Sequence, residues 1–259
     1  MAKLTSRNSL ACVICLTVFS LTVVSGGAGT VSAQWGNLKG QFIYNGKAPE
    51  PKKLDTTKEP VCVPHNLVDE SLLVAPDGGI KNVVIFVRTK KADLKINPAL
   101  GEPPAQIEID NKNCRFEPHL LVLQVGQTLL VKNSDPFSHN SNVTEIGGQG
   151  ANPLIAPGKE ATYKYVRSQM VPQPVACNIH PWMRAFVLPR DNPYFAVSSA
   201  DGKFEIKDLP VGKLEFQVWQ EKAGNVDTKE WPKGRFTMDI KAGDNDLGTV
   251  KLDPKLFNK

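Results

Sequence analysis

The chain reads Cys177-Asn178-Ile179-His180-Pro181-Trp182-Met183 near its middle, and this stretch decides how the rest is interpreted. Two residues separate Cys177 from His180 and two more separate His180 from Met183, so one tight loop can present sulfur, nitrogen and sulfur to a single point. A second nitrogen lies upstream at His139, within Asn133-Ser134-Asp135-Pro136-Phe137-Ser138-His139-Asn140. The four side chains supply one thiolate, two imidazoles and one thioether.

This donor set suits one copper ion cycling between Cu(I) and Cu(II), with a distant thioether as a weak axial ligand. Zinc is the competing metal, but it has little use for the thioether of Met183. Each residue also has a plainer interpretation: an isolated histidine after a strand, a cysteine buried as a small apolar residue, or a core methionine with Met170 as the spare axial candidate. Taken together, their order and spacing favour copper.

The rest of the chain has the pattern of β-structure. Residues alternate with period two in 106–109, 214–218 and 236–240, and turn signals such as Asn45-Gly46 and Asp201-Gly202 separate such runs. No long stretch shows a helical period. We therefore expect an all-β fold of packed sandwiches.

The ligand residues fall between expected strands. Strands are expected at 106–110, 120–125, 128–132, 162–166 and 185–188. His139 would then follow a strand end, and Cys177 to Met183 would form a loop between neighbouring strands. A site placed this way has its geometry fixed by the sheet behind it.

The first 33 residues resemble an export signal. Lys3 and Arg7 precede an apolar run over 10–24, and Val31-Ser32-Ala33 offers the small residues of a cleavage site after Ala33. A retained anchor is the alternative, but the run is shorter than the roughly 20 residues that a membrane span needs. We expect a periplasmic or extracellular protein with no membrane span in its mature part.

The charge of the chain argues against nucleic acid as a partner. The formal net charge is +5, and removing Lys3 and Arg7 with the leader leaves +3. The charged residues are interspersed, and no basic patch with interleaved aromatic residues is present.

Cys62 and Cys114 remain once Cys177 is assigned to the metal and Cys12 and Cys15 to the leader. In an exported protein two such cysteines most simply form a disulfide. The alternative is a second Cys2His2 metal site, in which His65 and His119 would join the two cysteines.

The two ligand motifs resemble those of the cupredoxin family of type 1 blue copper proteins, and the short Cys177-x2-His180-x2-Met183 loop is most similar to its amicyanin members and plastocyanin-like relatives. The similarity covers about 105–189 and implies a Greek-key β-sandwich. It implies that His139, Cys177 and His180 are equatorial ligands and Met183 is axial. It further implies that Asn140 ties the ligand loops together and that electrons leave at His180, beside Pro181 and Trp182, a pair bulkier than in many such loops.

The flanks are similar to another family. Residues 200–206 and Leu209-Pro210-Val211-Gly212, followed by the run to Trp219, resemble the transthyretin-like sandwich of carboxypeptidase regulatory domains, and 38–46 and 82–88 resemble its earlier strands. We expect a leader at 1–33, a first half of this second sandwich at 34–104, a cupredoxin domain at 105–190 and the second half at 191–259. The alternative is a pair of β-extensions packed on the cupredoxin.

Together these observations predict an exported mononuclear copper protein, not an enzyme, that carries single electrons between a donor and an acceptor protein. Four histidines are too few for an additional trinuclear copper centre. The alternatives are a copper carrier or storage protein without redox turnover, and a β-sandwich interaction module that binds no metal.

Overall fold

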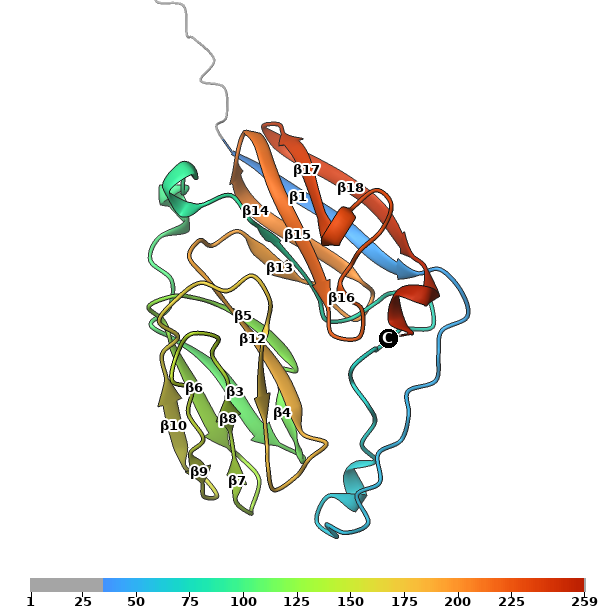
Figure 1. Ribbon diagram of the computed structural model, residues 1–259, viewed down its shortest axis with the longest axis vertical. Coiled ribbons are helices and arrows are strands. Elements are labelled where there is room, and N and C mark those ends of the chain that lie inside the picture. The colour runs from blue at the N-terminus through green and yellow to red at the C-terminus, as the bar shows by residue number, and fades with distance from the viewer. Residues whose placement is uncertain (1–34, 259) are drawn as a thin grey trace, which may run out of the picture. The chain divides into compact units, whose positions relative to one another are not determined.

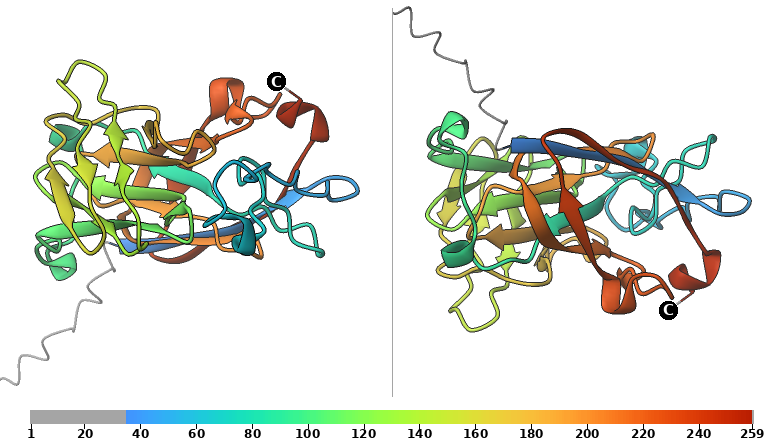
Figure 2. Two further views of the ribbon diagram at one scale, coloured as in Figure 1. Left: turned by 90° about the horizontal axis from the view of Figure 1, so that it is seen from below. Right: turned by 90° about the horizontal axis from the view of Figure 1, so that it is seen from above.

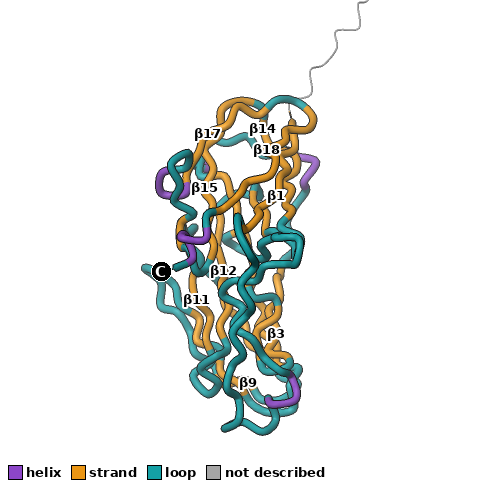
Figure 3. Tube along the Cα trace, turned by 90° about the vertical axis from the view of Figure 1, so that its right-hand side faces the viewer, coloured by secondary structure: helices purple, strands orange, loops and turns teal. Residues whose placement is uncertain are grey.

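The computed structural model describes residues 35–258, and the expected leader with its cleavage site at Ala33 lies outside the described residues. The fold is all-β, as predicted (Figure 1). Within the described residues the helices are short 3-10 turns (Figure 3): η1 (Val63–His65), η2 (Lys91–Asp93), η3 (Pro98–Leu100), η4 (Pro232–Gly234) and η5 (Pro254–Phe257). None of the described helices is long and apolar enough to cross a membrane.

The two ends of the described chain build one sandwich, here called the flanking sandwich. One sheet has the order β14 (Lys203–Pro210), β1 (Trp35–Tyr44), β18 (Gly243–Leu252). The other has the order β13 (Phe195–Val197), β2 (Val83–Val87), β15 (Gly212–Gln220), β16 (Gly224–Asn225), and β17 (Arg235–Ile240) also pairs with β15. Alternate residues of these strands meet in a common core that includes Leu38, Phe42, Ile85 and Phe216. The period-two pattern of the sequence therefore corresponds to one buried face per strand.

The middle of the chain builds the second sandwich, here called the central sandwich. One sheet has the order β10 (Glu160–Tyr163), β6 (Thr128–Asn133), β3 (Gln106–Lys112), β4 (Arg115–Glu117). The other has the order β5 (Leu120–Gln124), β12 (Arg184–Arg190), β11 (Gln173–Ala176), β8 (Asn142–Val143), and β7 (His139–Asn140) pairs separately with β9 (Leu154–Ile155). Its core includes Ile109, Leu123, Val131 and Val187.

A third apolar cluster joins the two sandwiches. Val84 and Phe86 of β2 pack with Leu120 of β5, Phe186 of β12 and Trp219 of β15. The neighbouring residues of β2 point instead into the flanking core, so Val83-Val84-Ile85-Phe86-Val87 is buried on both faces. This double burial explains why β2 is continuously apolar, whereas strands with one solvated face alternate.

The central sandwich is inserted between two adjacent strands of the flanking sandwich. β2 ends at Val87, and β13 returns antiparallel beside it, with Phe195 opposite Phe86. The chain therefore leaves the sheet at the end of β2 and re-enters it beside β2, at β13. Figure 2 shows the strands of the two sandwiches from two further sides.

One expected strand differs in position. The strand expected at 162–166 is β10, which runs from Glu160 to Tyr163. The backbone N–H of Val166 donates to the Glu145 carboxylate instead of a neighbouring strand, so the ladder ends earlier. An alternating sequence cannot reveal such a side-chain acceptor.

Candidate metal centre

Strand pairing positions the four predicted ligand residues. His139 lies on β7, shortly after β6 ends at Asn133. Cys177 directly follows β11 and Met183 directly precedes β12, and these two strands pair antiparallel. The backbone N–H of Cys177 donates to the carbonyl of Met183 at 3.1 Å, and that of Met183 donates to the carbonyl of His180 at 2.8 Å. The loop is thereby closed at its base and folded back on His180.

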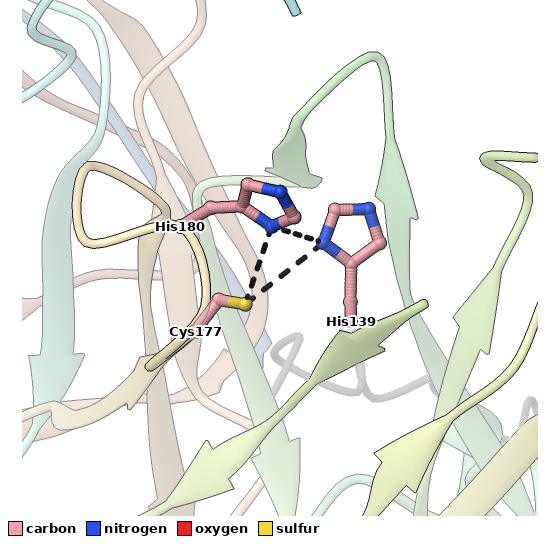
Figure 4. Close-up of side chains that lie close together, drawn as sticks. All are labelled: His139, Cys177 and His180. Carbon is pink, nitrogen blue, oxygen red and sulfur yellow. Dashed lines mark hydrogen bonds between the residues drawn. The ribbon is translucent and has the colours of Figure 1, made fainter. Parts of the chain in front are cut away.

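Three donor atoms converge at this place (Figure 4). His139 Nδ1 lies 3.0 Å from His180 Nδ1, and Cys177 Sγ lies 3.9 Å from the first and 3.6 Å from the second. A point equidistant from the three atoms lies about 2.1 Å from each, which is close to ordinary metal–nitrogen and metal–sulfur bond lengths. Within residues 35–258 this trio is the one group of three or more histidine, cysteine or acidic side chains arranged to hold a metal ion.

Burial favours the neutral form of both imidazoles. His139 is 0% exposed, Cys177 2% and His180 3%. Desolvation lowers the pKa of His139, although Asp135 opposes this effect, and desolvation together with His139 lowers the pKa of His180. Neutral imidazoles offer lone pairs rather than protons, which is the state that a metal ion requires.

Asp135 fixes the orientation of His139. Its Oδ2 lies 2.9 Å from His139 Nε2, so Nε2 carries the proton and donates, and Nδ1 is left as the lone pair facing the other donors. Asp135 is itself held by backbone N–H donors from Asn113 at 2.6 Å and Cys114 at 2.9 Å. Sequence reasoning did not identify this role, although Asp135 stands four residues before His139 in the quoted motif.

Asn140 connects the two ligand loops. Its Oδ1 accepts from the backbone N–H groups of Asn178 at 2.8 Å and Ile179 at 3.2 Å, and lies 3.4 Å from Cys177 Sγ. Its Nδ2 donates to Asn152 at 2.6 Å. The side chain of Asn140 therefore links its own strand to the start of the Cys177 loop, and its role at a metal site stays a prediction.

Met183 lies beside the trio. It is buried in the same apolar cluster as Cys177, and its role as an axial ligand stays a prediction. The spare candidate Met170 is half exposed, and its sulfur lies 3.7 Å from the guanidinium of Arg190. The structure therefore favours Met183 over Met170.

Aromatic rings surround His180, the predicted site of electron exit. The centroids of Phe137 and Trp182 lie 5.8 Å and 5.4 Å from its ring. Pro181 is exposed and Trp182 is half-buried, whereas His180 itself is closed off from solvent.

Cys62 and Cys114 form a disulfide, and within the described residues Cys177 is the free cysteine. The alternative Cys2His2 site is therefore absent from the structure. His119 instead lies between two carboxylates, with Nε2 2.6 Å from Glu221 and Nδ1 3.6 Å from Glu70. Glu70 precedes β2, His119 precedes β5 and Glu221 follows β15, so this bridge joins the central sandwich to both halves of the flanking chain.

The His119 bridge should make stability depend on pH. Burial disfavours the charged imidazolium, but Glu221 and Glu70 outweigh it and raise the pKa of His119 from 6.5 to about 9. The stabilisation is fully present below about pH 6.5 and is lost as pH rises through about 9, with an upper limit of about 3 kcal/mol. Denaturant unfolding between pH 6 and 10 should show this decline, and the decline should be smaller in His119→Gln. His65→Gln is the matched control, because His65 forms no ion pair within the described residues. An equal decline in both variants would contradict the assignment.

No protein-family model matches the chain, and no curated protein matches it. Among solved structures, the chain is similar to a copper-containing nitrite reductase from Thermus scotoductus SA-01, with 21% identity and a TM-score of 0.31 over 37% of this chain and 27% of the reductase. It is similar to a purple cupredoxin from Nitrosopumilus maritimus, with 25% identity and a TM-score of 0.28 over 33% of this chain and 99% of that one. A methionine-to-glutamine variant of amicyanin in its Cu(I) form matches with 19% identity and a TM-score of 0.31 over 36% of this chain and 89% of that one.

Proposed function

We propose that this chain is an exported protein that binds one copper ion through His139, Cys177 and His180, with Met183 as a weak axial ligand, and carries single electrons between a donor and an acceptor protein. The observation that supports this most directly is the convergence of one buried sulfur and two buried imidazole nitrogens on a common point. When bound, copper supplies a Cu(I)/Cu(II) couple.

Hydrogen bonds and strand pairing within the chain hold these donors in place. Asp135 fixes the tautomer of His139, Asn140 fixes the start of the Cys177 loop, and the β11–β12 pairing closes its end. Such preorganisation keeps the donor positions constant between two charge states, which favours fast electron exchange over bond-making chemistry. The three donor residues are also buried, and the rings of Phe137 and Trp182 lie beside His180. These features favour an electron carrier over an enzyme.

Titration of the purified protein with Cu(II) tests the proposal. We expect binding of one equivalent, an intense visible thiolate-to-copper absorption band and a reversible one-electron wave in voltammetry. A colourless Cu(I) complex without a wave would favour the carrier or storage function, and absence of bound copper would favour a metal-free interaction module.

Export is the second part of the proposal. The Cys62–Cys114 disulfide supports it, because such bonds persist in oxidising compartments such as the periplasm. The apolar segment before residue 33 supplies the corresponding leader.

Replacing Asp135 should weaken the metal site without removing a ligand. In Asp135→Asn the amide cannot accept from Asn113, Cys114 and His139 as a carboxylate does, so His139 loses its fixed orientation. We expect copper affinity to fall by about 10- to 100-fold, measured by competition with a chelator, together with a changed reduction potential.

Asp110→Asn is the control for this change. Asp110 also accepts from a backbone N–H and a side chain, but both belong to Ser134 and not to a ligand residue. A loss of affinity as large in Asp110→Asn as in Asp135→Asn would show that general loop damage explains the effect.

A further inference from the structure

His180 is buried although its neighbours in the same loop are exposed. Asn178, Ile179 and Pro181 of that loop are exposed, yet His180 is 3% exposed. Because loops usually run over the protein surface, the burial of His180 points to the groups that pack beside it.

The segment that packs against the aromatic residues beside His180 is residues 54–67, here called the cap. Its buried residues Cys62 and Leu67 form an apolar cluster with Cys114, and Phe137 and Trp182 pack against this cluster. Those two aromatic rings are the ones that flank His180. The carboxylate of Glu59, also in the cap, is near enough to act electrostatically on the His180 imidazole.

The cap has few other attachments. Its base is closed by the backbone bond from Leu54 to Leu67 at 3.0 Å. Its remaining hydrogen bonds run within the cap, such as Cys62 to Glu59 at 2.8 Å. In the described part of the chain no hydrogen bond or ion pair joins residues 55–66 to the sandwiches, so the disulfide to Cys114 and the apolar contacts hold the cap down.

Cys114 links the cap to both ligand loops. Its carbonyl accepts from Trp182 Nε1 at 3.2 Å, on the Cys177 loop. Its N–H donates to Asp135 Oδ2 at 2.9 Å, and this same oxygen accepts from His139. The disulfide therefore attaches the cap at Cys114, the residue that bonds to the Cys177 loop through Trp182 and supports His139 through Asp135.

We propose that the cap, locked by the Cys62–Cys114 disulfide, closes the His139–Cys177–His180 trio to reagents, and that cleavage of this disulfide opens it. Reduction by a dithiol breaks the S–S bond, converts both sulfurs to thiols and oxidises the dithiol to its own disulfide. In the locked state a redox partner meets the cap, where Val61 and Val63 are 49% and 45% exposed, rather than the edge of His180. This last consequence rests on the proposed electron-transfer function, whereas the closure of the trio does not.

Alkylation of Cys177 in the metal-free protein by iodoacetamide tests the cap directly. The rate is followed by mass spectrometry of the peptide that contains Cys177, which separates it from other cysteines. We expect slow alkylation in the wild type with its disulfide intact and at least a tenfold faster rate in Cys62→Ser/Cys114→Ser. Equal rates would overturn the proposal. Because the assay uses no copper, failure of copper binding leaves its outcome valid.

Two further variants separate opening of the cap from loss of the fold. Cys62→Ala/Cys114→Val removes the tether but keeps an apolar cluster, and it should retain the native far-ultraviolet circular dichroism spectrum while Cys177 reacts faster. Leu252→Ala creates a cavity in the flanking core, far in the fold from the cap cluster, and should leave Cys177 slow. Faster alkylation in Leu252→Ala, to the same degree as in the cysteine variants, would overturn the proposal by showing that any destabilisation exposes Cys177.

Discussion

Replacing Cys177 by alanine is expected to abolish both the visible absorption band and the voltammetric wave of the copper-loaded protein. The sulfur is the single thiolate donor in the trio, and two imidazoles alone cannot give a thiolate-to-copper transition. Because Cys177 is buried and small, the change should lower the free energy of unfolding by only about 1 kcal/mol. Spectroscopy and denaturant unfolding on the same sample measure the two effects separately.

Met170→Leu is the matched control for this variant. It also removes a sulfur from the central part of the chain, but Met170 is half exposed and contacts Arg190 rather than the trio. Its spectrum should be that of the wild type. A band that survives in Cys177→Ala would show that another residue supplies the sulfur donor.

Removing the disulfide should have the largest effect on stability. The bond joins residues 52 positions apart, and in the chain-entropy account closing a loop of that length stabilises the folded state by about 4 kcal/mol. Cys62→Ala/Cys114→Ala should therefore lower the free energy of unfolding at pH 7 by about 4 kcal/mol. The loss is measured as a lower midpoint of denaturant unfolding. The comparison is with wild-type protein in the absence of reductant.

Adding a dithiol provides the internal check. It should lower the midpoint of the wild type toward that of the double variant and leave the double variant unchanged. A difference below about 1 kcal/mol between the wild type and the double variant, both without reductant, would mean that the denatured chain is already compact around this pair.

The sequence was sufficient for the fold class because side chains alternate across a strand. Runs such as 214–218 therefore revealed their strands, and β15 extends this one to Gly212–Gln220. The packing of one sandwich on the other was not predictable in the same way. Val84 and Phe86 are apolar whichever sheet they face, and the pattern does not name Trp219 or Phe186 as their partners.

The candidate metal site was likewise predictable from the sequence only in part. His139, Cys177 and His180 were found because donor type and spacing are visible in the chain, and the structure brings them together. Asp135 was missed because an aspartate in a polar loop has many ordinary uses, and its role depends on where the Asn113 and Cys114 amides point. The cap was missed because residues 54–67 have no periodicity, and their position depends on the disulfide.

The pairing of β1 with β18 has a consequence for the order in which the protein can be made. These strands lie side by side in parallel, with Phe42 opposite Val250, so the edge of β1 that faces away from β14 lacks its neighbour until almost the last residues have left the ribosome. Residues 106–190 form a contiguous sandwich that is complete much earlier. We expect folding to begin in the middle of the chain, while β1 waits with an unpaired edge and is the segment most exposed to aggregation.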